Sequence, residues 1–407
     1  MATWGELEKA GTKWRDHEEM TWGKLEEFCV INPKTKQIPD DMEVSFVPMQ
    51  SVSETGDVQT DEVRKASEVK KGFTFFEEGD VLFAKITPCM ENGKGGIARG
   101  LKNGVGFGST EFHVLHPDPE KVSSEWLYYL TSWDEFRKQC ARNMTGSAGQ
   151  KRVPKSYLEH YKVNLPPLEE QRRIAALLDK VSDLIAKRRA QLDKLDLLVK
   201  ARFVEMFGDP VINPYSWNVS ALSELGECKN GMNFHTDDSG AVIHCLGVGD
   251  FKDLSLIEDT SKLPTISLNE MPSEDYLLAN GDIVFVRSNG NKALVGRSVA
   301  VYPNDIPTTF SGFCIRFRIQ NPAILPSYLL RVLKTDSMRK KMAGRGANIQ
   351  NLNQKILAEL RIPIPGLALQ EEYELFIKKV DKSKLTIQRS FDKLEILKKA
   401  LMQQYFG

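Results

Sequence analysis

Residues 192–208 read LDKLDLLVKARFVEMFG, and residues 391–407 read FDKLEILKKALMQQYFG. Eight of these seventeen aligned positions are identical without a gap, whereas unrelated segments of this length would share about one. Further upstream, LPPLEEQ (165–171) aligns with IPGLALQ (364–370), and GSAGQ (146–150) resembles GANIQ (346–350). The sequence therefore predicts an internal duplication, whose strongest matches lie towards the end of each copy.

The two copies also share a skeleton in their first parts. GDVLFAKIT (79–87) corresponds to GDIVFVRSN (281–289), and the segments that begin at Trp22 and Trp217 correspond more loosely. Between these matches the copies diverge, so we expect one scaffold that carries two different surfaces. The predicted order is a leader (1–21), a first head (22–165), a first long helix (166–208), a second head (209–363) and a second long helix (364–407).

Each copy ends in a segment with the apolar spacing of a long helix. Apolar residues recur every three or four positions between Pro166–Pro167 and Gly208, and a matching stripe runs through the second copy. Proline favours the start of a helix and glycine its end, so each helix should be about 55 Å long. Pairing the two stripes in an antiparallel coiled coil would bury both, although the helices could instead brace one compact domain. The residues expected to pair them are Leu178, Val181, Leu195, Phe203, Ile377, Val380, Leu394 and Leu401.

The heads have the texture of mixed α/β domains. Short strand patterns, such as residues 81–85 and 282–286, alternate with turns rich in Gly, Asn, Pro and Ser. The predicted fold class is α+β, with two mixed α/β domains separated by two long antiparallel helices in a pseudo-two-fold repeat.

The composition excludes several classes of protein. Lys and Arg total 55, as do Asp and Glu, so no global positive field attracts nucleic acid. No run of eighteen apolar residues is present and the start lacks the apolar core of a signal peptide, so we expect a cytoplasmic protein without membrane contact. The six cysteines form no CxxC pair, which favours buried reduced thiols over zinc or disulfides.

Local cation clusters are the candidate DNA contacts. Each head ends in a helix-like, locally basic stretch, residues 135–152 in the first and 331–350 in the second. Cations neutralise phosphate, and Gln can bond adenine through both amide atoms. The alternative is that these stretches are solvated helix ends. The candidate DNA-binding residues are Lys85, Thr87, Arg142, Gln150, Lys151, Arg152, Arg287, Asn289, Arg339, Lys340, Arg345, Asn348 and Gln350.

The common catalytic motifs are missing from the sequence. Neither GxxxxGK[ST] nor HExxH is present, and the glycine clusters lack the strand, helix and acid of a dinucleotide site. Asn213-Pro214-Tyr215 resembles the [DNS]PP[YFW] motif of amino-methyltransferases but lacks its second proline, so we interpret it as a turn. We therefore expect a chain with no catalytic residue, metal or cofactor of its own.

The segment LPPLEEQRRIAALLDK, with its long helix ending in FGDP, resembles the specificity subunits of type I restriction-modification systems. The resemblance spans nearly the whole chain and is weaker in the second copy, where Gly366 replaces the second proline and Tyr373 replaces the isoleucine. It implies two target-recognition domains that each read a few base pairs of double-stranded DNA, and helices that measure the unread spacer.

The resemblance also implies partner subunits that supply the chemistry. Two adenine methyltransferase subunits would bind the scaffold together with S-adenosylmethionine, and restriction/translocase subunits would use ATP with Mg. Three alternatives are the specificity subunit of a combined-type restriction system, a self-sufficient methyltransferase or nuclease, and a coiled-coil scaffold whose heads bind peptides.

Overall fold

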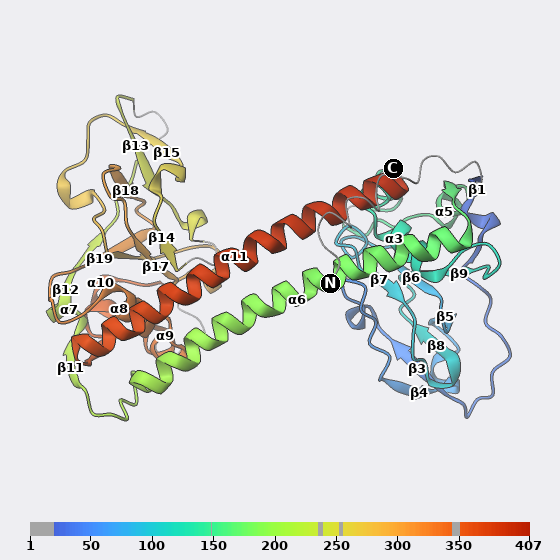
Figure 1. Ribbon diagram of the computed structural model, residues 1–407, viewed down its shortest axis with the longest axis horizontal. Helices are drawn as coiled ribbons and strands as arrows, with labels where there is room; N and C mark the ends of the chain where they lie inside the picture. Colours follow the sequence, from blue (N-terminus) through green and yellow to red (C-terminus); the bar gives the residue numbers. More distant parts are fainter. Residues whose placement is uncertain (1–19, 148, 235–238, 252–254, 344–350) are drawn as a thin grey trace. The chain divides into compact units, whose positions relative to one another are not determined.

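The computed structural model describes residues 20–147, 149–234, 239–251, 255–343 and 351–407. The chain divides into two compact units (Figure 1): unit 1 comprises residues 1–189 and 389–407, and unit 2 comprises residues 190–388. Two helices of 40 residues, α6 (Leu168–Phe207) and α11 (Leu367–Phe406), contribute to both units. The predicted fold class, two mixed α/β heads with two long helices, is confirmed.

The head of unit 1 contains two four-stranded sheets and a short antiparallel pair. The sheets have the orders β2-β9-β6-β7 and β4-β3-β8-β5, while β1 pairs with β10 just before α6 begins. Leu82 lies opposite Val114 in the central pair of the first sheet. The strands are β1 (Thr21–Lys24), β2 (Cys29–Ile31), β3 (Glu43–Val47), β4 (Val63–Lys65), β5 (Thr74–Glu77), β6 (Val81–Ala84), β7 (Gly95–Ile97), β8 (Val105–Gly108), β9 (Phe112–Pro117) and β10 (Lys162–Leu165), and the short helices are α2 (Ala66–Val69), α3 (Ser124–Ser132), α4 (Asp134–Arg142) and α5 (Lys155–Glu159).

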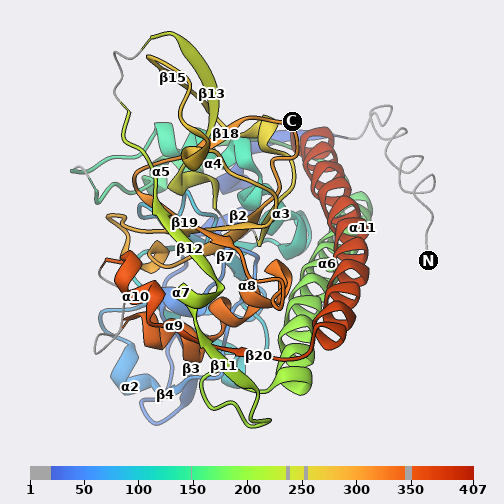
Figure 2. The same ribbon diagram turned by 90° about the vertical axis from the view of Figure 1, so that its left-hand side faces the viewer.

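The head of unit 2 has a five-stranded sheet, a three-stranded sheet and a matching antiparallel pair. The sheets have the orders β12-β19-β16-β17-β14 and β15-β13-β18, and β11 pairs with β20 before α11. Figures 1 and 2 both show β13 and β15 projecting from the rest of this unit. The strands are β11 (Asn218–Ala221), β12 (Gly226–Asn230), β13 (Ala241–Leu246), β14 (Leu256–Ile257), β15 (Thr265–Leu268), β16 (Asp282–Val286), β17 (Ser298–Val301), β18 (Thr308–Phe310), β19 (Cys314–Ile319) and β20 (Arg361–Ile364), and the short helices are α7 (Leu222–Leu225), α8 (Pro326–Lys334), α9 (Asp336–Ala343) and α10 (Gln354–Ala358).

The central strand pairs of the two heads have the same register. Leu82 faces Val114 in unit 1, and Val284 faces Arg316 in unit 2. Both partners are displaced by 202 positions between the copies, since 284 − 82 and 316 − 114 give the same number. The duplication therefore extends through the sheets, where the sequences themselves have largely diverged.

In unit 1, the first half of α6 packs antiparallel to the last part of α11 and against the head. Ile174, Leu178 and Val181 share one core with Leu394 and Leu401. That core also contains α3 and α4 side chains, so burial of the two apolar stripes fixes the helices to the head as well as to each other. This burial stabilises the unit by roughly 1.5–3 kcal/mol per large apolar side chain.

In unit 2, the last half of α6 lies antiparallel to the first half of α11. The Tyr373 hydroxyl donates to the Val199 carbonyl at 3.2 Å, and the Lys384 ammonium lies 2.6 Å from the Asp196 carboxylate. Phe203 packs against Tyr373 in an edge-on contact, with ring centroids 5.6 Å apart. Among the other predicted pairing residues of this unit, Val380 is buried and Leu195 and Ile377 are partly buried.

Both helices begin and end where proline and glycine predict. Helix α6 starts one residue after Pro166–Pro167, and Gly208 follows its last residue with a φ of +75°. A Cβ atom at Gly208 would lie 2.3 Å from the Pro214 ring, so a side chain is excluded here by both the backbone angle and the space. Helix α11 likewise begins directly after Gly366.

A buried glutamine connects each long helix to its head. Gln171 donates to the carbonyls of Pro166 and Lys121 at 2.8 and 2.9 Å, and accepts from the Ser123 amide at 2.9 Å. Gln370 makes the equivalent bonds in unit 2, to the carbonyls of Pro365 and Ala323 and from the Leu325 amide. Both side chains are fully buried. The glutamine shared by LPPLEEQ and IPGLALQ therefore satisfies backbone groups where the strand, the long helix and the head meet.

A buried aspartate follows an equivalent glycine in each head but has different partners. The Asp80 carboxylate accepts from the Glu77 amide at 2.8 Å and lies 2.6 Å from His116 Nδ1. In unit 2, Asp282 accepts from the Ala279 amide and binds both Nε and Nη2 of Arg318, at 2.9 and 2.7 Å. The turn is thus retained, whereas the side chain that compensates the buried carboxylate is not.

Two details of the sequence-based prediction are wrong. The basic stretch 135–152 is helical only to Arg142. Beyond it the chain turns, with Gly146 and Gly149 at positive φ, and an isolated bridge joins Thr145 to Arg152. Trp22 corresponds to Val219 rather than to Trp217. Trp22 on β1 lies opposite Asn164, and Val219 on β11 lies opposite Pro363. Asn164 and Pro363 are equivalent, because each is four residues before the start of a long helix.

All six cysteines are free, and Cys29, Cys140, Cys245 and Cys314 are buried. Within the described ranges, no helix is both long enough and apolar enough to cross a membrane.

Candidate nucleic-acid interface

The first head brings two predicted DNA-binding segments together at the end of β6. The Val153 amide donates to the Lys85 carbonyl at 2.9 Å, and the Thr87 amide donates to the Lys151 carbonyl at 3.0 Å. The Lys151 amide in turn donates to the Thr87 hydroxyl at 3.1 Å. Segments 66 positions apart, counted from Lys85 to Lys151, therefore form one cationic edge.

A carboxylate that the sequence analysis did not single out lies within this edge. The Glu111 carboxylate accepts two hydrogen bonds from the Arg152 guanidinium, one from Nε and one from Nη2, each of 2.8 Å. The bonds to Arg152 are the main cause of the lowered pKa of Glu111, to which Lys85 also contributes. Arg152 is therefore held in a planar, two-bond geometry, and its charge is that of half an ion pair rather than of an isolated cation.

The other two candidates of the first head are exposed. Arg142 lies at the end of α4, where its guanidinium is 3.7 Å from the Glu135 carboxylate. Gln150 is also exposed, and its backbone carbonyl accepts a hydrogen bond from Arg152 Nη1 at 3.2 Å. Both side chains are accessible to a large ligand.

His113 positions this edge from inside the sheet. Its Nε2 lies 2.8 Å from the Val153 carbonyl and its Nδ1 lies 3.0 Å from the Asn32 amide nitrogen. A neutral ring that donates from Nε2 and accepts at Nδ1 satisfies both contacts. Burial lowers the pKa of His113 to about 4. Residue 315 is the equivalent position in unit 2, where Ile315 lies opposite Phe285 as His113 lies opposite Phe83.

We expect acid to weaken the first head through His113. The unfolded chain binds a proton near pH 6.5, whereas the folded ring stays neutral to about pH 4. Stability is therefore lost as the pH falls between these values, by up to roughly 3 kcal/mol at 1.36 kcal/mol per pH unit. The protection of the peptide that contains Val153 against hydrogen exchange, measured relative to the intrinsic exchange rate at each pH, should fall across this range. His113→Gln keeps a donor without titrating, so the same loss of protection in that variant would contradict the assignment.

In the second head, Arg287 and Asn289 follow β16 as Lys85 and Thr87 follow β6. The Leu352 amide donates to the Arg287 carbonyl at 3.0 Å, which repeats the bond between Val153 and Lys85. The side-chain oxygen Oδ1 of Asn289 accepts from the Asn291 backbone amide at 2.8 Å. Arg345, Asn348 and Gln350 lie outside the described residues.

Arg339 and Lys340 are placed differently, although they are neighbours on α9. The Arg339 guanidinium donates to the carbonyls of Gly296 and Val295 at 3.1 and 3.4 Å, and burial lowers its pKa. Lys340 is exposed. Nearby, burial and then the charge of Arg331 lower the pKa of Lys334 to about 8. Arg339 thus has a structural role in attaching α9 to the segment before β17, whereas Lys340 is exposed.

The features that resemble catalytic motifs have structural roles. The Asn213 side chain donates to the Trp217 carbonyl and accepts from its amide at 2.9 and 3.0 Å, so Asn213-Pro214-Tyr215 is a turn, as predicted.

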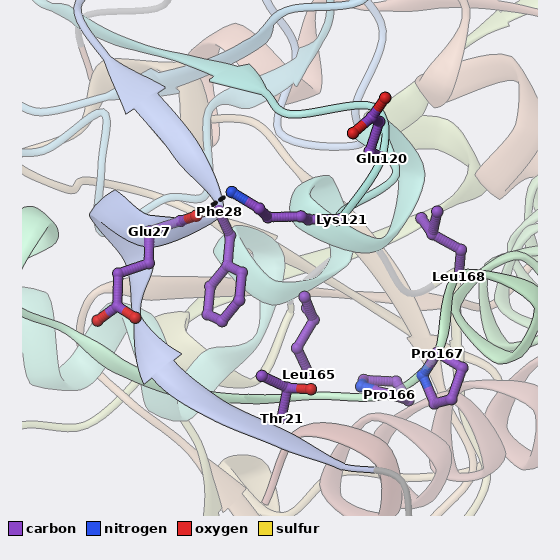
Figure 3. Close-up of a pocket in the computed structure, with 9 residues that line it drawn as sticks. All are labelled: Thr21, Glu27, Phe28, Glu120, Lys121, Leu165, Pro166, Pro167 and Leu168. Carbon is purple, nitrogen blue, oxygen red and sulfur yellow. Dashed lines mark hydrogen bonds between the residues drawn. The ribbon is translucent and has the colours of Figure 1, made fainter.

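A pocket of about 490 Å³ lies where β1 and β10 meet the start of α6 (Figure 3). Lys121 lines this pocket together with Pro166 and Pro167 and donates to the Glu27 carbonyl at 3.2 Å. Among the described residues, no cluster of His, Cys, Asp and Glu could hold a metal.

These observations define a class of protein in which two α/β heads with equivalent central strands, each with a cationic strand edge, share two long helices. A family model described as the type I restriction modification DNA specificity domain matches residues 17–195 and 214–397. The chain belongs to this family.

Similar proteins share part of the sequence or the fold. The chain is 42% identical over 181 residues to the EcoEI specificity subunit of Escherichia coli and 44% identical over 154 residues to the EcoAI subunit. These alignments cover 44% and 38% of this chain but only 30% and 26% of those relatives. The MjaVIII specificity subunit of Methanocaldococcus jannaschii is 23% identical over 296 residues, 68% of each protein.

Solved structures show the same fold at low identity. A chain from a study of complex assembly and conformational transition of the type I R-M system has a TM-score of 0.61 at 19% identity, and the match covers 97% of this chain and 99% of that one. The type I S subunit from M. genitalium has a TM-score of 0.55 at 13% identity, covering 97% and 98%.

Proposed function

We propose that this chain is the specificity subunit of a type I restriction-modification complex and reads a bipartite site in double-stranded DNA, one half-site per head. The observation that carries the proposal is the paired edge at the ends of β6 and β16. Lys85 and Arg287 hold equivalent backbone positions there, while the side chains around them differ between heads. Two heads with equivalent backbone positions but different side chains can read two half-sites of different sequence.

The long helices would act as the spacer and the assembly surface. Each is a single helix of 40 residues that contributes to both units. Two methyltransferase subunits would bind this scaffold and carry S-adenosylmethionine, and restriction/translocase subunits would supply ATP-dependent cleavage with Mg. Family membership supports these partners. The chain itself would perform no chemical step, and its residues would bind and orient the duplex.

A binding experiment tests the proposal. The chain, assembled with methyltransferase subunits of a type I system, is incubated with a random duplex pool, and bound sequences are enriched. We expect the enriched duplexes to bind at least about 1,000-fold more tightly than random ones, with an affinity that falls as salt rises. The chain without partners should neither methylate nor cleave. A scaffold whose heads bind peptides would enrich no sequence, and methylation by the purified chain alone would also contradict the proposal.

A further inference from the structure

The edge of each head is closed by the same four-residue turn, Ser109–Phe112 in unit 1 and Ser311–Cys314 in unit 2. In unit 1 the Glu111 amide donates to the Ser109 hydroxyl at 3.2 Å, and the Phe112 amide donates to the Ser109 carbonyl at 3.2 Å. In unit 2 the Phe313 amide donates to the Ser311 hydroxyl at 3.3 Å, and the Cys314 amide donates to the Ser311 carbonyl at 2.8 Å. The two turns are therefore built alike around a serine.

The third residue of the turn has the same backbone partner in both heads. The Lys85 amide donates to the Glu111 carbonyl at 2.9 Å, and the Arg287 amide donates to the Phe313 carbonyl at 2.8 Å. Glu111 and Phe313 are thus equivalent positions beside equivalent cations. Their side chains have opposite chemistry, because one is a carboxylate paired with Arg152 and the other is an aromatic ring.

Phe313 is exposed where a buried aromatic residue would be expected. Its relative exposure is 61%, whereas Phe310, the residue just before the same turn, is fully buried. Phe234, on the neighbouring segment, is 38% exposed. That segment reaches the turn through a bond from the Met232 amide to the Phe310 carbonyl. The ring is therefore presented on a backbone fixed from two sides.

The residues around the turn pack closely against the neighbouring segment and lie beside polar side chains. Gly312 precedes Phe313, and a Cβ atom there would lie 2.1 Å from the Asn233 side-chain oxygen. Arg287 and Asn289, both partly exposed, come directly after the adjacent strand β16. An aromatic ring flanked by a cation and amides has the composition of a surface that contacts bases and phosphates together.

We propose that Phe313 is a specificity-determining residue of the second head, whose ring contacts the apolar surface of one base in the duplex. This inference rests on the proposed function and deepens it. An aromatic ring can contact the C5 methyl group of thymine in the major groove, or the face of a base at an opened step. The first head uses the Glu111–Arg152 pair at the same position, so the two heads read different sequences with one frame.

The test uses the complex with its methyltransferase subunits and the duplex enriched by the unmodified chain. Phe313→Ala should weaken binding to that duplex by roughly 10- to 100-fold, the range of one good base contact, and relax the preference at one position of one half-site. Phe313→Leu should lose less, because it keeps an apolar side chain. Replacing each thymine by uracil in turn distinguishes the two contacts, because only a methyl contact loses affinity at a single position.

Val242→Ala is the matched control, since Val242 is 65% exposed on β13 of the same head. It should leave affinity and sequence preference unchanged. Thermal unfolding of all variants by circular dichroism checks that they fold. Phe313→Ala and Phe313→Leu binding within twofold of the unmodified chain, with the same enriched sequence, would overturn the inference. If the unmodified chain enriches no duplex, the proposed function itself is contradicted.

Discussion

Gln171→Leu should lower the free energy of unfolding of unit 1 by about 3–5 kcal/mol. The side chain is fully buried and bonds to Ser123, Lys121 and Pro166. Leucine fills a similar volume but leaves one buried amide and two carbonyls without this partner, at a cost of about 1–3 kcal/mol for each group that stays unsatisfied. Lys121 and Pro166 line the pocket of Figure 3, so water can replace part of the loss there.

Urea unfolding followed by hydrogen exchange assigns the loss to a unit. The effect of Gln171→Leu should appear in peptides from α3 and the start of α6, and Gln370→Leu should have the same effect on α8 and α11. Glu169→Gln, on an exposed neighbour, is the matched control and should change stability by less than about 0.5 kcal/mol. A loss below about 1 kcal/mol for Gln171→Leu would show that the glutamine does not hold helix and head together.

Lengthening both long helices by one turn should change the spacer of the DNA site and leave both half-sites unchanged. Four residues add about 6 Å and a rotation of about 40° to a helix, while one base pair adds about 3.4 Å and a rotation of about 35°. The preferred spacer should therefore grow by one or two base pairs. The insertions go after Asp193 in α6 and after Ile387 in α11. Both points lie between the Lys384–Asp196 ion pair and the contact of Arg189 with the Phe391 ring, so the helices stay matched in length.

The readout is the sequence enriched from the random duplex pool. A variant in which alanine replaces Gln191, Leu192 and Asp193 is a length-neutral control, and it should keep the original spacer. An altered base preference in either half-site, or an unchanged spacer in the lengthened chain, would mean that the helices do not set the distance between the bases that are read.

The helices were predictable because their signals are local. The apolar spacing, Pro166–Pro167 and Gly208 predicted α6 to within a few residues, since periodicity and chain breakers act over one or two turns. The turn after Arg142 was missed because the cations of residues 135–152 suggested one continuous stretch, although Gly146 and Gly149 lie within it. Glycine at positive φ was the available signal that the helix had ended.

The partners of the candidate residues could not be predicted, because they are distant in the sequence. The sequence shows the charge of Arg152 but not Glu111, 41 positions away, which binds it through two bonds. It likewise does not show that the Arg339 guanidinium is bonded to the carbonyls of Val295 and Gly296. The equivalence of Glu111 and Phe313 is visible only in the backbone hydrogen bonds that their carbonyls accept from Lys85 and Arg287, because a carboxylate and an aromatic ring have no chemical similarity.

The central claim is that each head reads one half of a bipartite site. The most direct measurement is a map of methylated adenines in cells that express the chain with its methyltransferase subunits, before and after residues 22–150 are exchanged for the first head of another family member. We predict that one half-site is replaced, while the spacer and the other half-site stay the same. A change in both half-sites, a change in the spacer alone, or a map without a bipartite sequence would contradict the account.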